Sequence, residues 1–118
     1  MPSRTSLSDP RIALSPRGSV VRCPCCDGLA LRFDGVGVTL TPSHLRRMRA
    51  AVHAVCDESE RRRSPWGWAL RARTDRESAV FSLSADDADA LADLLDAAVA
   101  VLDLDALLLD TLGPRPAA

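Results

Sequence analysis

The stretch Leu29–Leu40 constrains the fold most, because it reads as two short strands joined by a tight turn. Apolar residues alternate with polar or small ones on both sides of Asp34-Gly35, a dipeptide typical of two-residue β-hairpin turns. Thr41 is a good helix N-cap, and Pro42 at the first helical position loses no hydrogen bond that it would otherwise make. The sequence therefore predicts a hairpin followed by a helix from Pro42 to about Cys56.

The second half of the chain repeats this order of elements. It predicts a strand over Trp66–Arg73, a returning strand over Ala79–Leu83 and a second helix capped by Ser84. Each hairpin-helix unit has an apolar sheet face that it cannot bury alone, so we expect the two units to share a core. The predicted fold class is α+β, with two ββα units (about 22–56 and 66–112) sharing one four-stranded antiparallel sheet and both helices on one face.

The two ends of the chain differ in composition from its middle. Residues 1–19 are rich in Pro, Ser and Arg and show no periodicity, which predicts a disordered tail. Gly113 and Pro114 terminate the second helix and leave residues 113–118 as another tail. We therefore expect a single α+β domain over residues 20–112.

Four cysteines are the candidate metal ligands. Cys23-Pro-x-Cys26 followed by Gly28 has the spacing of a zinc knuckle, in which two thiolates hold one tetrahedral metal. His44, in the first turn of the first helix, should lie at the same end of the hairpin as the knuckle. Cys25 completes the intrachain set, although a ligand from a second chain is an alternative. The competing interpretations are reduced cysteines in a turn without metal, and redox or nucleophilic chemistry.

The charges are divided between the two parts of the chain. Residues 1–76 contain 14 Arg and 7 acidic residues, whereas residues 77–118 contain 1 Arg and 9 acidic residues. The simplest interpretation is a basic first helix lying beside an acidic second helix. The alternative is a nucleic-acid-binding face, in which a loop carrying Arg61, Arg62 and Arg63 contacts phosphate and Trp66 stacks on a base.

The residues around 102–109 are more apolar than one helix face can bury against a small sheet. This excess predicts a homodimer interface or a site for a protein partner, unless the helix end packs over the edge of the sheet. The sequence contains no run of 18 apolar residues and no secretory signal pattern. We therefore expect a cytoplasmic protein without a membrane partner.

The knuckle, the Leu-x-Phe-x-x-Val hairpin, the Thr-Pro helix start and the second hairpin-helix unit resemble a group of short bacterial proteins known only as a domain of unknown function. The resemblance covers about residues 22–100 and implies neither an activity nor a functional residue. No Gly-rich phosphate loop, inward carboxylate pair or Ser/His/Asp arrangement is visible, so no catalytic residue is predicted and an enzyme is the least favoured class. The favoured class is a small cytosolic interaction or regulatory module, stabilised by zinc and dimeric. Nucleic-acid binding is the alternative.

Overall fold

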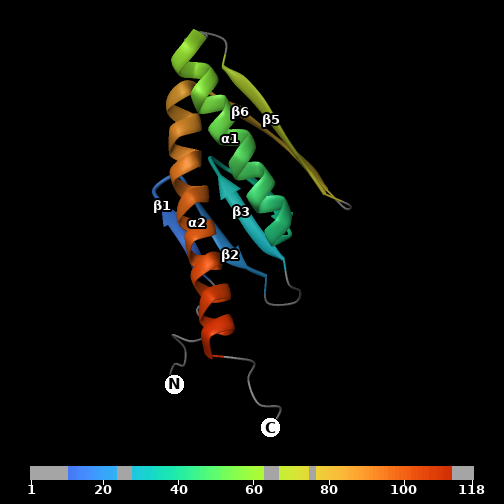
Figure 1. Cartoon of the computed structure of the whole chain (residues 1–118). Helices are drawn as coiled ribbons and strands as arrows, with labels where there is room; N and C mark the ends of the chain where they lie inside the picture. The colour runs from blue at the N-terminus through green and yellow to red at the C-terminus, as the bar shows by residue number, and fades with distance from the viewer. Residues whose placement is uncertain (1–10, 24–27, 63–66, 75–76, 113–118) are drawn as a thin grey trace.

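The computed structural model describes residues 11–23, 28–62, 67–74 and 77–112. These residues form six strands and two helices (Figure 1). In chain order the elements are β1 (Arg11–Ser15), β2 (Gly18–Arg22), β3 (Leu29–Phe33), β4 (Val36–Leu40), α1 (Pro42–Arg62), β5 (Trp68–Arg73), β6 (Ser78–Leu83) and α2 (Ala85–Leu112). The α+β class is confirmed.

The strands form two antiparallel sheets. One sheet has four strands in the order β1-β2-β3-β4, and β5 pairs only with β6. We predicted one four-stranded sheet shared by two ββα units. The four-stranded sheet of the structure instead contains β1 and β2 in place of β5 and β6. β6 lies near β4 without pairing with it, and the Glu77 carboxylate accepts a hydrogen bond from the backbone N–H of Thr39 on β4 (2.8 Å).

The first hairpin occupies residues that the sequence analysis assigned to a tail. Ile12, Ala13 and Val20 are buried, and β2 pairs along its whole length with β3 from Gly18↔Phe33 to Arg22↔Leu29. The prediction of a tail through residue 19 is thus wrong from Arg11 onward, because a few buried side chains and a pairing edge on β3 suffice to order this segment. Residues 1–10 and 113–118 lie outside the described residues.

The tight turn between β3 and β4 is confirmed. Asp34 and Gly35 have φ angles of 51° and 84°, the left-handed values that a type I′ hairpin turn requires at both central positions. Arg17, in the turn between β1 and β2, pairs with the carboxylate of Asp34 and with that of Asp87 on α2 (2.5 Å). Its guanidinium also lies 4.9 Å from the centre of the Phe33 ring. Arg17 therefore connects the β1–β2 turn and the β3–β4 turn to the start of α2.

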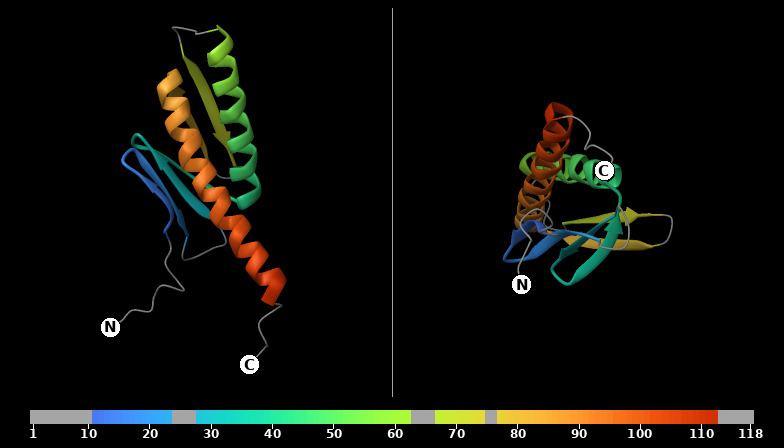
Figure 2. Two further views of the ribbon diagram at one scale, coloured as in Figure 1. Left: turned by 60° about the vertical axis from the view of Figure 1, so that its left-hand side comes forward. Right: turned by 90° about the horizontal axis from the view of Figure 1, so that it is seen from below.

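Side chains from both sheets and both helices meet in one core, as expected for units that cannot bury their faces separately. Figure 2 shows the two helices side by side on the same side of the strands. The most deeply buried side chains come from every layer: Phe33, Phe81, Leu29, Leu31, Leu45, Leu91, Leu95, Val20 and Val52. The shared core is therefore confirmed, although the two hairpins belong to separate sheets.

Both helices begin where the sequence predicts. The Thr41 hydroxyl accepts a hydrogen bond from the His44 N–H (3.1 Å), and the Ser84 hydroxyl accepts one from the Asp87 N–H (3.1 Å). The Asp87 carboxylate in turn accepts the Ser84 N–H (2.9 Å), which completes a reciprocal cap. α1 ends at Arg62, later than the predicted end near Cys56, because the first helix-breaking residue after Cys56 is Pro65.

The basic and acidic helices lie side by side and neutralise each other, as the charge division predicts. Arg46 pairs with Asp103 (2.7 Å), and Asp96 accepts hydrogen bonds from Arg49 (2.6 Å) and His53 (2.7 Å). The hydrogen bond to His53, and secondarily that to Arg49, lower the pKa of Asp96, because both interactions favour its charged form.

Candidate functional site

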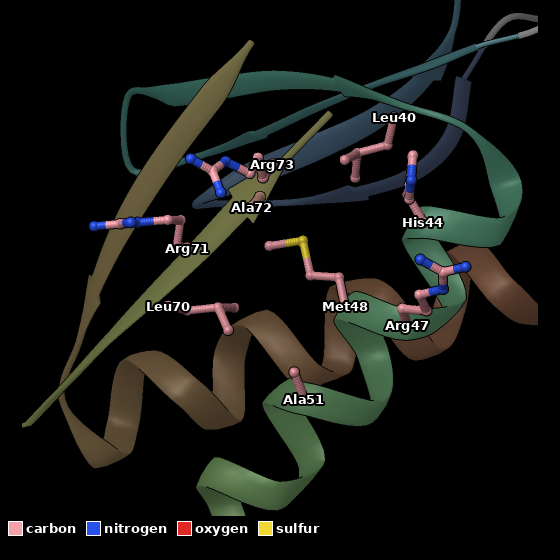
Figure 3. A pocket seen from close by; sticks show the side chains of 9 residues that line it. All are labelled: Leu40, His44, Arg47, Met48, Ala51, Leu70, Arg71, Ala72 and Arg73. Carbon is pink, nitrogen blue, oxygen red and sulfur yellow. The ribbon is translucent and has the colours of Figure 1, made fainter. Parts of the chain in front are cut away.

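A groove separates the first turns of α1 from strand β5, and nine residues line it (Figure 3). Its volume is about 290 Å³, near the lower end of the range for small-molecule sites. The lining residues are Leu40 at the end of β4, His44, Arg47, Met48 and Ala51 on α1, and Leu70, Arg71, Ala72 and Arg73 on β5. Apolar and cationic side chains therefore alternate around one hollow.

The sequence positions these side chains through two regular elements. Positions 44, 47, 48 and 51 are three or four apart, so they share one side of α1. In β5 the burial alternates, with Ala72 buried and Leu70 half-buried, whereas Arg71 and Arg73 are exposed. Figure 3 shows Met48 extending from α1 toward β5, with Leu40 above it. The groove thus has an apolar base with Arg47 on its helix side, whereas the Arg71 and Arg73 side chains extend from β5 away from Met48.

The three arginines of the groove have no ion-pair partner within the described ranges, which distinguishes them from four other arginines that the structure describes. Arg17, Arg22, Arg46 and Arg49 are each paired with at least one aspartate. Arg47, Arg71 and Arg73 form no such pair with any residue that the structure describes. Positive charge at the groove is therefore not neutralised by that part of the protein.

His44 adds an unsatisfied polar atom to the groove. Its Nδ1 is buried, and it has no hydrogen-bond partner in the described part of the chain. Buried polar atoms in folded proteins nearly always have a partner, and an orphan calls for a specific explanation. A metal ion or the oxygen of a bound ligand would provide that partner.

The predicted zinc ligands are only partly within the described residues. Cys23 is half-buried, and its N–H donates to the Gly28 carbonyl (2.9 Å), so these two residues of the knuckle motif lie close together. Cys25 and Cys26 lie outside the described residues. Among the residues that are described, no three His, Cys, Asp or Glu side chains gather around a common point. The zinc site therefore stays a prediction.

The predicted nucleic-acid residues are likewise not placed by the structure. Arg61 and Arg62 belong to the last turn of α1, and not to a loop as predicted, but their side chains are outside the described set. Arg63 and Trp66 are outside it entirely. Sequence reasoning missed the groove arginines, because Arg71 and Arg73 read only as the outward residues of a strand. Arg71 and Arg73 border the same groove as Arg47 only because β5 packs against α1, and local sequence signals do not predict this packing.

A second unusual surface is the C-terminal part of α2. Figure 2 shows its last turns extending past the strands, and they carry four exposed leucines: Leu104, Leu107, Leu108 and Leu109. The prediction that this leucine cluster exceeds what the chain buries is confirmed for these residues. Neither helix of the described structure is both long enough and apolar enough to span a membrane.

No family model, curated protein or solved structure matches this chain. The resemblance to the uncharacterised bacterial group therefore remains a prediction, and functional proposals rest on the chain's own residues.

Proposed function

We propose that this protein is a small cytosolic interaction module that self-associates through the C-terminal part of α2. The observation that carries the proposal is the exposure of four leucines within six residues, with 53 % of Leu104 and 60 % of Leu107 accessible. A helix that is apolar on several sides is normally buried, so this part of α2 calls for a partner.

The spacing of the exposed residues supports a second copy of the chain as that partner. Ala97, Ala100, Leu104 and Leu107 are exposed and follow one another at intervals of three, four and three residues. This is the spacing of a helix–helix seam. In an antiparallel pair of α2 helices centred near Leu102, Ala97 and Ala100 of one copy would face Leu107 and Leu104 of the other, which favours close packing.

The charges near this seam support the same partner. Two acidic helices would ordinarily repel each other, but Arg46 pairs with Asp103 and Arg22 pairs with Asp105 within each chain. These pairs neutralise much of the negative charge beside the leucines before any partner arrives. Surface ion pairs stabilise a folded chain only slightly, so we infer that these two pairs mainly reduce the repulsion between the two α2 helices.

Sedimentation velocity of the full chain tests this proposal over about 1 to 100 μM, the range in which a weak dimer dissociates. We expect the wild type to form a dimer as concentration rises, and the double variant Leu104→Gln, Leu107→Gln to stay monomeric. Leu14→Gln is the matched control, because Leu14 on β1 is 61 % exposed and lies outside the seam. Circular dichroism checks that all variants stay folded.

Two results would count against self-association. One is a wild type that is monomeric at every concentration, and the other is a control variant that dissociates as much as the double variant. A complex of one copy of this chain with a different protein would support an interaction module but would contradict self-association.

Zinc binding at the knuckle is a second proposal, favoured by the unpartnered Nδ1 of His44. The register Leu29↔Leu40 puts the end of the knuckle loop at the same sheet end as the start of α1, where His44 lies. Metal analysis of protein purified without chelator should give near-stoichiometric zinc in the wild type and none in the double variant Cys23→Ser, Cys26→Ser. Cys56→Ser on α1 should keep its metal. A wild type that is metal-free and melts normally in chelator contradicts this proposal.

A further inference from the structure

The groove between α1 and β5 is a second functional surface, separate from the leucines at the end of α2. We propose that it binds a small organic anion, a phosphate or carboxylate attached to an apolar body. This inference does not depend on self-association, since no groove residue belongs to the proposed seam.

The anionic end of the ligand follows from the unpaired arginines. Arg47 on α1 lines the hollow without an ion-pair partner among the described residues, and Arg71 and Arg73, likewise unpaired there, border it from β5 with side chains that extend away from Met48. Guanidinium groups match phosphate and carboxylate oxygens through paired N–H donors. The groove therefore favours a negatively charged group.

The apolar body of the ligand follows from the base of the groove. Leu40, Met48, Leu70 and Ala72 supply carbon and sulfur surface between the arginines. Met is well suited to contact apolar ligands of irregular shape, because its side chain is flexible and polarisable. An inorganic anion would leave this surface in contact with water. A bound aromatic or short aliphatic group would cover it, which favours an organic anion.

His44 provides an orientation for the ligand. Its buried Nδ1 has no partner in the described structure and belongs to a residue that lines the groove. A ligand hydroxyl or anionic oxygen within reach of this nitrogen would satisfy it by donating to it or accepting from it, depending on the tautomer of the ring. The groove thus offers cationic, apolar and neutral polar contacts in one small volume, as ligand sites typically do.

Titration of the full chain with phenyl phosphate, followed by the backbone amide signals in NMR, tests the proposal. We expect saturable shifts at residues 44–51 and 70–73. Inorganic phosphate and benzyl alcohol carry the anionic and apolar halves of the probe separately, and each should bind at least about tenfold more weakly because it forgoes the other half's contacts.

The variant Arg47→Gln should weaken phenyl phosphate binding about tenfold, the loss expected for one charge-assisted contact, whereas Arg71→Gln should weaken it less because the Arg71 side chain extends away from Met48. Arg32→Gln is the matched control, because Arg32 is an exposed strand arginine without an ion pair in the described chain and does not line the groove. We expect it to bind as the wild type does.

Several outcomes would overturn the proposal. Equal weakening by Arg32→Gln would show a general charge effect, and inorganic phosphate binding as tightly as phenyl phosphate would remove the apolar contribution. Shifts confined to other parts of the chain would place the ligand elsewhere. Tighter, salt-sensitive binding of a single-stranded oligonucleotide that depends on Arg47 and Arg71 would make the groove part of a nucleic-acid interface instead.

Discussion

Replacing Gly18 by alanine tests whether the first hairpin belongs to the sheet. A Cβ atom at this position would overlap the carbonyl oxygen of Arg32 and would lie 3.1 Å from both the carbonyl carbon of Arg32 and the Cα of Phe33. All three atoms belong to the backbone of β3, so no side chain can rotate away to make room. β2 would have to move away from β3 at the point where Gly18 pairs with Phe33.

The expected magnitude follows from two costs. Forcing an extra carbon into a packed site costs about 1–3 kcal/mol, and losing one ladder hydrogen bond as the strands separate adds about 1 kcal/mol. We therefore expect the free energy of unfolding to fall by about 2–4 kcal/mol. For a domain of about 100 residues this corresponds to a decrease in Tm of about 8–16 °C.

The assay is thermal and urea unfolding of the full chain, with Gly37→Ala as the matched control. Gly37 lies in β4 of the same sheet, but its nearest neighbours to an added Cβ, Arg32 Cγ and the Leu31 carbonyl oxygen, are 3.6 Å away, an ordinary contact distance. We expect this variant to stay within about 1 kcal/mol of the wild type. If the Gly18 and Gly37 variants unfold alike, Gly18 does not approach β3 and residues 11–22 are not part of the sheet.

Three further variants probe other parts of the fold. Ser84→Ala should lower the free energy of unfolding by about 1 kcal/mol in urea titrations, because the first turn of α2 loses its cap; an unchanged midpoint would contradict the reciprocal cap. In the folded state the Ser84 N–H, and then Arg17, lower the pKa of Asp87 below its ordinary value of 3.8, so its contribution is present above that pH and is lost as pH falls through the folded pKa. Wild-type stability should therefore fall more between pH 4 and pH 2 than that of Asp87→Asn, and parallel pH profiles would refute this. Leu95→Ala should cost about 2–5 kcal/mol, measured in the same titrations, because Leu95 on α2 is fully buried in the shared core; a loss below about 1 kcal/mol would show that α2 does not pack as described.

Local signals predicted the strands β3 to β6 and the starts of both helices, because each depends on a few adjacent residues. The left-handed turn at Asp34-Gly35 requires only its own two residues, and the caps at Thr41 and Ser84 act within one helical turn. Phe81 and Leu83, at alternate positions of the predicted strand Ala79–Leu83, are buried for the same reason, since alternation along a strand is a local property. These signals determine whether a segment forms a strand, a turn or a helix, but not which strand lies beside it in a sheet.

The arrangement of the strands was beyond local signals. β1 offers only Ile12 and Ala13 as buried residues, too few to give a strand pattern within a segment rich in Pro and Ser. Its place in the sheet depends on pairing with β2, which in turn pairs with β3. Once β2 occupies one edge of β3 and β4 the other, the second hairpin cannot pair with β3, and β6 lies near the outer edge of β4. There the Glu77 side chain, and not a strand, accepts the Thr39 N–H.

The groove was hidden from the sequence for a related reason, which the pattern of ion pairs makes clear. The division into a basic front part and an acidic back part predicts that charges cancel across the fold, and for arginines that face α2 or a hairpin turn they do. Cancellation needs an aspartate within reach, and in the described part of the chain the α2 aspartates that form ion pairs with arginines do so with α1, β2 and the turn between β1 and β2. Arg71 and Arg73 therefore retain their charge where β5 meets the side of α1 that carries Arg47. A chain with almost equal numbers of acidic and basic residues thus keeps a local excess of positive charge above an apolar base. That excess is the property on which binding of an organic anion depends.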